Sequence, residues 1–350
     1  MSIRNIPGPS HWLNRFTWFL AVATLFLICS GGMVTSKGVG LAVPDWPTTF
    51  GYNMFLFPVS KWVGGVFFEH THRLMGSVVG FLTIILAGWL WFVEPRRWVR
   101  NLGLAALGAV ILQGVLGGLR VTMLKDEIGV FHACLAQAFL GLIVFIALAT
   151  ARHWEGWSRS GLDQKHVGTI RRIALATTVL IYFQLALGAT MRHQHRDLAI
   201  VDFPTANKAW IPDTGSAALA AVNAWRDTRG LSDVTAFQIW LQMTHRFGAL
   251  LVACGITAFW IAVRKLGTGA TPFRGLSNIW LAIMLCQVTL GAWTIWSNKA
   301  ADIATAHVAF GAIMFSVAVA ICAISWRISQ LQSGLRYGMP SLQTDAMARL

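Results

Sequence analysis

The sequence predicts an all-α polytopic membrane protein, whose eight transmembrane helices form two tandem four-helix bundles. Three observations support this fold. Of the 350 residues, 55% are hydrophobic and 12% are charged, whereas a soluble domain carries about 25% charged residues. The apolar segments approach the ~20 residues that a helix needs to cross the hydrocarbon layer. Short polar motifs also recur in the same order in the two halves of the chain, which indicates an internal repeat.

Eight apolar segments are expected to form the spanning helices. The links after the second and sixth of them, 94–97 and 264–274, are short and basic. The longest polar stretch, 192–235, contains Pro204 and Pro212 and is predicted to form a structured external loop. The spans are expected near residues 15–35, 66–93, 101–121, 128–151, 171–191, 236–263, 277–296 and 303–326.

The distribution of charge predicts the orientation of the chain. The formal net charge is +14. If the N-terminus is placed inside, most Lys and Arg residues fall in inner segments and most Asp and Glu residues in outer segments. Because basic residues mark cytoplasmic loops, both termini are expected in the cytoplasm. The same rule explains the basic character of the chain, so we do not expect a nucleic-acid-binding protein.

The cysteines and the first apolar segment give two further expectations. All five cysteines lie inside apolar segments, so no loop disulfide and no CxxC metal site is expected. The first apolar segment is long and no cleavage pattern follows it, which favours a mature helix over a signal peptide. The cysteines are Cys29, Cys134, Cys254, Cys286 and Cys322.

The internal repeat predicts how the chain is divided. Each half has an even number of spans, so the halves have the same orientation and are expected to be related by a pseudo-twofold axis along the membrane normal. We expect a first half at 1–151, a cytoplasmic linker at 152–170, a second half at 171–330 and a cytoplasmic tail at 331–350. The matching motifs are Asp45-Trp46-Pro47-Thr48 with Asp202-Phe203-Pro204-Thr205, His72-Arg73 with His245-Arg246, Gln113 to Gly117 with Gln287 to Gly291 (and a third copy, Gln184 to Gly188), and His132 with His307.

Four histidines are the strongest candidates for chemistry. His72, His132, His245 and His307 each stand near the start of an even-numbered span, so all four are expected near the outer surface, two in each half. A single histidine inside a membrane often only joins helices by a hydrogen bond, but four at matched positions favour ligands. Zinc sites need three or four ligands. A pair of histidines suits haem, whose iron needs only axial ligands.

Small residues follow the candidate ligands on the same helix faces. They are expected either to leave room for a flat macrocycle or to allow close packing of helices. Neither explanation is favoured by this feature alone. The small residues are Gly76 and Gly80 after His72, Ala136 after His132, Gly248 after His245 and Gly311 after His307.

Charged neighbours complete the predicted sites. Arg73 and Arg246 directly follow two of the candidate ligands and are expected to pair with haem propionates or to anchor the helix ends at the interface. Glu69 lies three residues before His72, whereas the second half has Gln242 at that place. Only one site therefore has an ionisable carboxylate, which favours proton-coupled oxidation there. The alternative for Glu69 is a helix-start acid stabilised by the macrodipole.

Other polar residues receive weaker expectations. Asp45 and Asp202 precede an aromatic residue and proline in outer loops, and either cap those loops or help to close the sites. His70, His193 and His195 have no counterpart at ligand positions and are expected to be surface residues.

These motifs resemble those of the haem A synthase family, over about residues 15–326. The resemblance rests on Glu69-His70-Thr71-His72-Arg73, Pro44-Asp45-Trp46-Pro47, Met243-Thr244-His245-Arg246, His132 and His307. Residues 36–66 contain no cysteine, so the chain looks like the cysteine-free type of proteobacteria and mitochondria. The short N-terminal segment favours a bacterial plasma membrane.

The resemblance implies two haem sites and one reaction. It implies a haem b cofactor on His245 and His307, and the substrate haem O on His72 and His132, with Glu69 as the catalytic carboxylate. A methyl group of haem O would be oxidised to a formyl by successive hydroxylations, giving haem A for cytochrome oxidase. A haem-O-forming prenyltransferase and an unidentified electron donor are the implied partners.

The residues also bear on three other functions. A bis-haem b electron carrier, linked to quinol, would need similar environments at both sites, which the Glu69/Gln242 difference argues against. A transporter would need a polar path across the bilayer, and no charged residue lies in mid-membrane. A purely structural subunit would leave four placed histidines unexplained.

Overall fold

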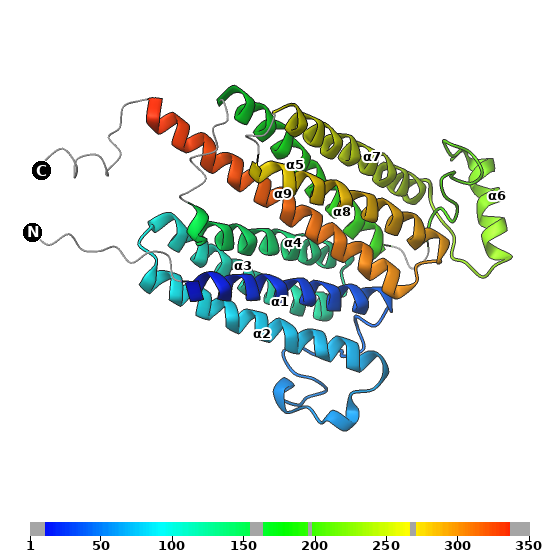
Figure 1. Cartoon of the computed structure of the whole chain (residues 1–350). Helices are drawn as coiled ribbons and strands as arrows, with labels where there is room; N and C mark the ends of the chain where they lie inside the picture. Colours follow the sequence, from blue (N-terminus) through cyan, green and yellow to red (C-terminus); the bar gives the residue numbers. More distant parts are fainter. Residues whose placement is uncertain (1–10, 155–163, 195–197, 267–270, 337–350) are drawn as a thin grey trace, which may run out of the picture.

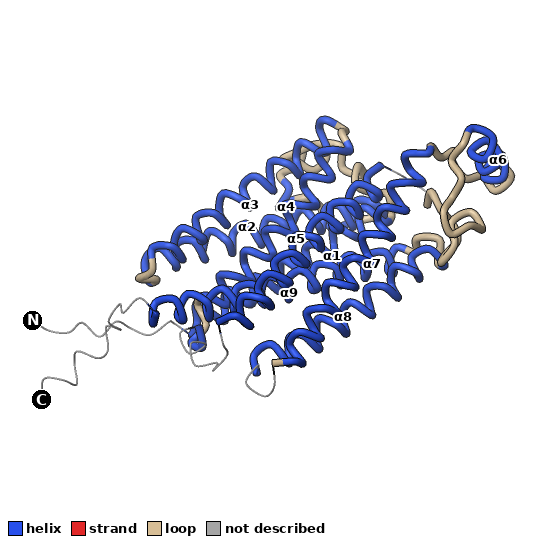
Figure 2. The backbone as a smooth tube through the Cα atoms, turned by 90° about the horizontal axis from the view of Figure 1, so that it is seen from above, coloured by secondary structure: helices blue, strands red, loops and turns tan. Residues whose placement is uncertain are grey.

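The computed structural model describes residues 11–154, 164–194, 198–266 and 271–336. Eight long apolar helices run through this part of the chain, and all eight predicted spans are confirmed. The described residues contain no β-strand (Figure 2). The spans are α1 (His11–Ser36), α2 (Gly64–Val93), α3 (Arg97–Met123), α4 (Asp126–Ala149), α5 (Gln164–Gln194), α7 (Ala236–Lys265), α8 (Thr271–Trp296) and α9 (Ala301–Arg336).

Most helices are longer than the apolar segments from which they were predicted. The fifth begins at Gln164 and the last continues to Arg336, because polar residues at the ends of a span can extend the helix beyond the hydrocarbon layer. The predicted external loop contains one further helix, α6 (Ser216–Asp227), and the first external loop contains two short 3-10 helices, Met54–Leu56 and Val59–Lys61. A third 3-10 helix, Arg152–Trp154, follows α4.

The outer surface of the helices is apolar, as lipid requires. Large hydrophobic side chains are widely exposed, including Phe92 at 85% and Phe81 at 63% of their surface. A water-soluble protein rarely leaves contiguous apolar surface of this extent uncovered. The chain is therefore a multi-pass membrane protein.

The helices form two groups, each with its own buried core. Helices α1 to α4 contact one another in a closed ring, and so do α5, α7, α8 and α9. One buried apolar cluster comes almost entirely from the first group and another from the second. The groups meet where α9 contacts α1 and α4, and where α4 contacts α5. Gly141 permits the close approach of α4 and α9, since a Cβ atom there would lie 2.9 Å from the ring of Phe315.

The symmetry axis and the exact domain boundaries stay predictions. Parts of the predicted linker and tail, 155–163 and 337–350, lie outside the described residues, as do the basic residues Arg4, Arg159 and Arg349 that support the orientation.

The two ends of the molecule differ in what they carry. The first external loop and α6 project from one end, and α1 starts and α9 ends at the other (Figure 1). At that opposite end Trp98, Trp154 and Trp326 cluster with Phe145. Arg96 pairs with the buried Glu94 and also donates to the carbonyl of Ala149 at the end of α4. The candidate ligands lie toward the end that carries the loops.

Candidate active site

Each of the four candidate ligands packs against a glycine of the helix that precedes it in its own group. A Cβ atom on Gly31 of α1 would lie 2.9 Å from Cε1 of His72. The corresponding distances are 3.2 Å for Gly117 and His132, 3.3 Å for Gly188 and His245, and 3.2 Å for Gly291 and His307. Any larger residue would push the imidazole away. Glycine therefore lets each ring enter the space between two helices.

The Nδ1 atoms of the four imidazole rings have similar surroundings. Nδ1 of each ring is buried and forms no hydrogen bond of ordinary geometry with a described residue. Each histidine as a whole is partly exposed, so the open part of the ring lies away from Nδ1. His72 is close enough to His132 to interact electrostatically, and His245 to His307. The structure thus brings the candidates together as two pairs, one in each helix group.

The repeated Gln-x-x-x-Gly motif has a structural explanation. Nε2 of Gln113 donates to the carbonyl of His132 at 2.9 Å, and Nε2 of Gln184 donates to the carbonyl of His245 at 2.7 Å. The glycine one turn later in each motif then contacts the ring of the same histidine. The glutamine holds the backbone of the ligand helix while the glycine makes room for its side chain.

The small residues on the ligand helices divide between the halves. Ideal Cβ atoms on Gly76 and Gly80 of α2 would meet nothing within 4 Å, as expected for an open face. The other alternative, close helix packing, holds for Gly248, where the side chain of Gln184 lies, and for Gly311, which contacts Leu185 and Gln287. These two glycines serve close helix packing, the explanation that was left open.

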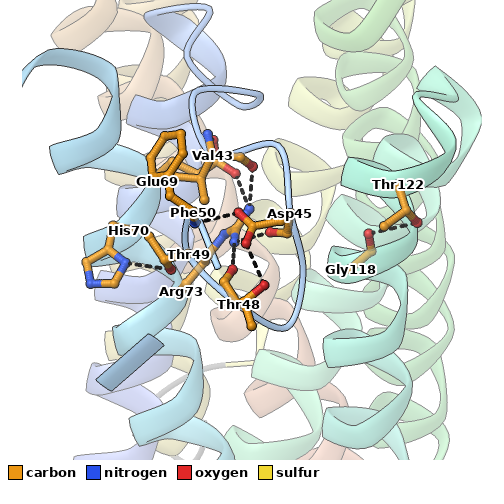
Figure 3. Close-up of polar contacts among 10 residues, drawn as sticks. All are labelled: Val43, Asp45, Thr48, Thr49, Phe50, Glu69, His70, Arg73, Gly118 and Thr122. Carbon is orange, nitrogen blue, oxygen red and sulfur yellow. Dashed lines mark hydrogen bonds and ion pairs between the residues drawn. The ribbon is translucent and has the colours of Figure 1, made fainter. Parts of the chain in front are cut away.

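Arg73 and Arg246 hold the two outer loops against the helices. Figure 3 shows the contacts of Arg73 in the first half. Nη1 of Arg73 donates to the carbonyls of Asp45 and Thr48, at 2.6 and 3.1 Å, and Nη2 donates to the carbonyl of Val43 at 2.7 Å. In the second half, Nη2 of Arg246 donates to the carbonyl of Asp202 at 2.7 Å, and its Nη1 donates to the carbonyl of Thr205. The terminal nitrogens of both arginines therefore already have backbone partners. The predicted contact of these arginines with propionates stays a prediction.

Asp45 and Asp202 cap the loops that the arginines hold. Oδ1 of Asp202 accepts from the backbone N–H of Asn207 at 2.8 Å and Oδ2 from that of Lys208 at 3.0 Å. Asp45 accepts in the same way from Phe50 and Gly51. Burial opposes ionisation, but the hydrogen bonds prevail and lower the pKa of both carboxyls below its ordinary value. Of the two predicted roles, the loop cap is the one that these bonds support.

Glu69 and Gln242 occupy equivalent places with different chemistry. Oε2 of Glu69 accepts from the backbone N–H of Val43 at 2.9 Å, and Oε1 pairs with Arg73 at 2.7 Å. Oε1 of Gln242 accepts from the backbone N–H of Ile200 at 2.9 Å, and its Nε2 donates to the carbonyl of the same residue. Both side chains are buried. The loop is thus held alike in both halves, but only the first half has a carboxylate at this position.

Several residues near the sites were not identified from the sequence. His70 is fully buried between Phe57 and Trp62 and lies 3.2 Å from the hydroxyl of Thr49, so its prediction as a surface residue was wrong. The helix pattern does not record that the first external loop, with Phe57 and Trp62, covers this residue. His193 is partly buried against Gly129 of α4. His195 lies outside the described residues.

Two arginines were also missed. Arg192 of α5 donates to the carbonyl of Gly32 and the hydroxyl of Ser36, at 2.8 and 2.7 Å, and thereby joins the two helix groups. Arg120, in the last turn of α3, lies close enough to both His72 and His132 to interact with them electrostatically. Nothing in the local sequence distinguished these residues from interfacial anchors.

The arrangement fits a haem better than a metal ion bound by protein alone. Within the described ranges, no group of three or more His, Cys, Asp or Glu side chains could hold a metal ion. Two partly exposed imidazoles per helix group, with open space beside Gly76 and Gly80 in the first group, suit a macrocycle that supplies four nitrogens itself. The four histidines are the residues that would hold the iron.

The lowered pKa of Asp202 predicts how the second loop responds to acid. The ionised carboxylate is stabilised in the folded state, so its contribution is complete above the ordinary value of about 4 and is lost as the pH falls through the lowered pKa. Asp202→Asn should therefore lower the melting temperature at pH 6, and this difference should shrink in more acidic buffer. The exposed Asp233→Asn serves as the control. A difference that is independent of pH would contradict the role of the charge.

Comparison with known proteins agrees with this geometry. The family model of the COX15-CtaA cytochrome oxidase assembly proteins matches residues 52–319. The chain is 26% identical to a heme A synthase of Shouchella clausii, over 73% of this chain and 85% of the relative. It is 25% identical to one of Geobacillus kaustophilus, over 86% and 88%, and 30% identical to one of Cereibacter sphaeroides, over 68% and 62%. The matched region contains all four histidines, and the chain belongs to the COX15-CtaA family of cytochrome oxidase assembly proteins.

Proposed function

We infer that the chain is a haem A synthase, a membrane oxidoreductase that converts haem O to haem A. The family and the shared name of its curated relatives support this activity, and eight apolar helices place it in a membrane. A methyl group of haem O would be oxidised to a formyl through two hydroxylations, each a two-electron oxidation of that carbon, and loss of water. The oxidant and the electron partner would come from outside this chain. The oxidised product serves cytochrome oxidase.

The single observation that carries the assignment of the halves is the difference between Glu69 and Gln242. Each side chain accepts a hydrogen bond of 2.9 Å from a backbone N–H in the outer loop of its own half. A carrier that only passes electrons between two haems would need no carboxylate at one of them. We therefore place the oxidation in the first half, with haem O between His72 and His132.

The second half is proposed to hold a permanent haem b. His245 and His307 would hold it, because they belong to the same helix group, lie close enough to interact electrostatically and pack against Gly188 and Gly291. When bound, this haem supplies one-electron redox chemistry. Gln184 keeps the backbone of His245 in place through a bond of 2.7 Å.

The residues of the first half would prepare the methyl group for oxidation. His72 and His132 orient the substrate through its iron, since their rings are fixed by Gly31 and Gly117. Glu69 can take up a proton on Oε1 or Oε2 and pass it on. Its ion pair with Arg73 keeps the carboxylate next to the outer loop. That loop, held by the arginine, would shield the site from water.

The chain is further proposed to work in a bacterial plasma membrane. Both termini would be cytoplasmic and both haem sites near the periplasmic side, as the charge distribution predicts. A haem-O-forming prenyltransferase would deliver the substrate, and an electron partner that is not yet identified would complete the reaction. Family membership supports these expectations without naming either partner.

Glu69→Gln tests the position of the chemistry. Glutamine already fits the equivalent place in the second half, so the variant should fold and keep its loop bond to Val43. General acid–base residues contribute roughly 100-fold or more to rates, and haem A should fall by about that factor, with haem O or a hydroxylated intermediate accumulating. Haem is extracted from cells that supply haem O and is separated by chromatography. The exposed Glu127→Gln is the control and should leave the amount of haem A unchanged. An unchanged amount of haem A in Glu69→Gln would contradict the assignment of the oxidation to the first half.

Single histidine variants test which half holds which haem. Protein purified with His245→Ala or His307→Ala should lose the haem b absorption of the wild type, because one axial ligand is removed. Protein with His72→Ala or His132→Ala should keep that absorption and lose conversion of haem O. The reverse pattern would exchange the two sites, and retention of haem b in all four variants would contradict histidine ligation.

Reporter fusions test the orientation. Alkaline phosphatase is active only in the periplasm, so a fusion after Asp213 should be active and a fusion after Leu350 inactive. A green fluorescent protein fused after Leu350 should be fluorescent. The opposite activities would invert the topology and place the haem sites at the cytoplasmic face.

A further inference from the structure

Arg120 is an unpaired cation close to the first histidine pair, His72 and His132. It lies in the last turn of α3 and interacts electrostatically with His72 and His132. It forms no hydrogen bond or ion pair with any residue that the structure describes. The other two arginines of this region are engaged: Arg73 bonds three carbonyls and Glu69, and Arg192 bonds two carbonyls and a hydroxyl.

The backbone around Arg120 makes room for its guanidinium group. A Cβ atom on Gly40, in the first external loop, would lie 2.9 Å from Nη2 and 3.2 Å from Nη1. A Cβ atom on Gly129 of α4 would lie 3.2 Å from Nε. The group therefore lies between the loop and α4, with a glycine beside it on either side. An arginine that only extended its charge to the membrane interface would not need these two glycines beside its guanidinium group.

The two carboxylates that influence Arg120 do not form an ion pair with it. Glu69 is the nearest buried carboxylate that influences it, but Glu69 is already paired with Arg73 at 2.7 Å. Asp126 influences it as well but is exposed and makes no ion pair with it. His193 lies against the same Gly129 and supplies no anion either. A partly buried cation without a counter-ion is unfavourable in a low dielectric, and a bound anion would relieve that cost.

The second half does not repeat this feature. The motifs Gln113 to Gly117 and Gln287 to Gly291 align α3 with α8, and this alignment places Thr294 where the first half has Arg120. The hydroxyl of Thr294 donates to the carbonyl of Leu290 in its own helix at 2.8 Å. The second half has no cation at this place, and Arg192, which interacts electrostatically with His307, is already bound by two carbonyls and a hydroxyl.

We propose that Arg120 binds a carboxylate of the ligand of the first half, namely a propionate side chain of the substrate porphyrin. The inference rests on the proposed function, since it needs a porphyrin between His72 and His132. A guanidinium forms two parallel hydrogen bonds with a carboxylate, which fixes direction as well as distance. Two histidines define the axis through the iron but leave the ring free to rotate about it. Arg120 removes that freedom and selects which methyl group faces Glu69.

The test compares an acidic porphyrin with its ester. The full-length protein, purified in detergent with its second-half haem, is titrated with iron protoporphyrin IX or with its dimethyl ester, and binding is followed by tryptophan fluorescence. Hydrogen bonds to charged groups are strong enough that Arg120→Gln should weaken binding of the free acid about tenfold or more. Binding of the ester should not change. Arg120→Lys should lie between, and the exposed Lys125→Gln should bind like the wild type.

Each other outcome has a definite meaning. Equal weakening of acid and ester by Arg120→Gln, or no weakening of either, would overturn the carboxylate contact. His72→Ala should weaken both ligands, because it acts on the iron. If neither His72→Ala nor His132→Ala weakens either ligand, the first half does not bind the porphyrin, and the proposed function fails together with this inference. The absorption of the second-half haem reports in every variant that the protein is folded.

Discussion

The contact between an imidazole and a glycine on the neighbouring helix is the interaction on which the arrangement of this protein depends. It occurs four times, and each time a Cβ atom would lie 2.9–3.3 Å from Cε1 of the ring. Hydrocarbon does not drive helices together as water does, so close packing through small residues sets the distance between them. A polar ring placed at such a contact is shielded from lipid and held at a fixed depth. The same feature that lets the helices associate therefore also positions the candidate ligands.

The loops extend this principle to the outer end of the helices. Arg73 and Arg246 each donate hydrogen bonds to several backbone carbonyls of a loop. Asp45 and Asp202 accept hydrogen bonds from backbone N–H groups of the same loops. Polar backbone at a membrane surface has few partners unless side chains supply them. Each loop is thus folded by one cation on its helix and one anion of its own. This framework is built alike in both halves, which lets single substitutions create different chemistry on it.

Two such substitutions separate the halves. Glu69 replaces the amide of Gln242, and Arg120 stands where the second half has Thr294. Both changes leave the framework intact, because Glu69 keeps the loop bond and Arg120 uses glycine-lined space. They add a buried carboxylate and an unpaired cation to the first site. A site that merely holds a redox group needs neither, whereas a site that turns over an acidic substrate uses both.

The sequence alone determined the number of spans, the internal repeat, the four histidines and the Glu69/Gln242 difference. These features depend on composition and on local periodicity, which lipid enforces along each helix. Only the tertiary structure decided that Gly248 and Gly311 contact protein side chains, that His70 is buried, and that Arg120 reaches the first pair. Such contacts join residues of different helices, and they depend on how each helix is rotated against its neighbours. No pattern within one segment records that rotation, because it is set by the packing of all the helices together.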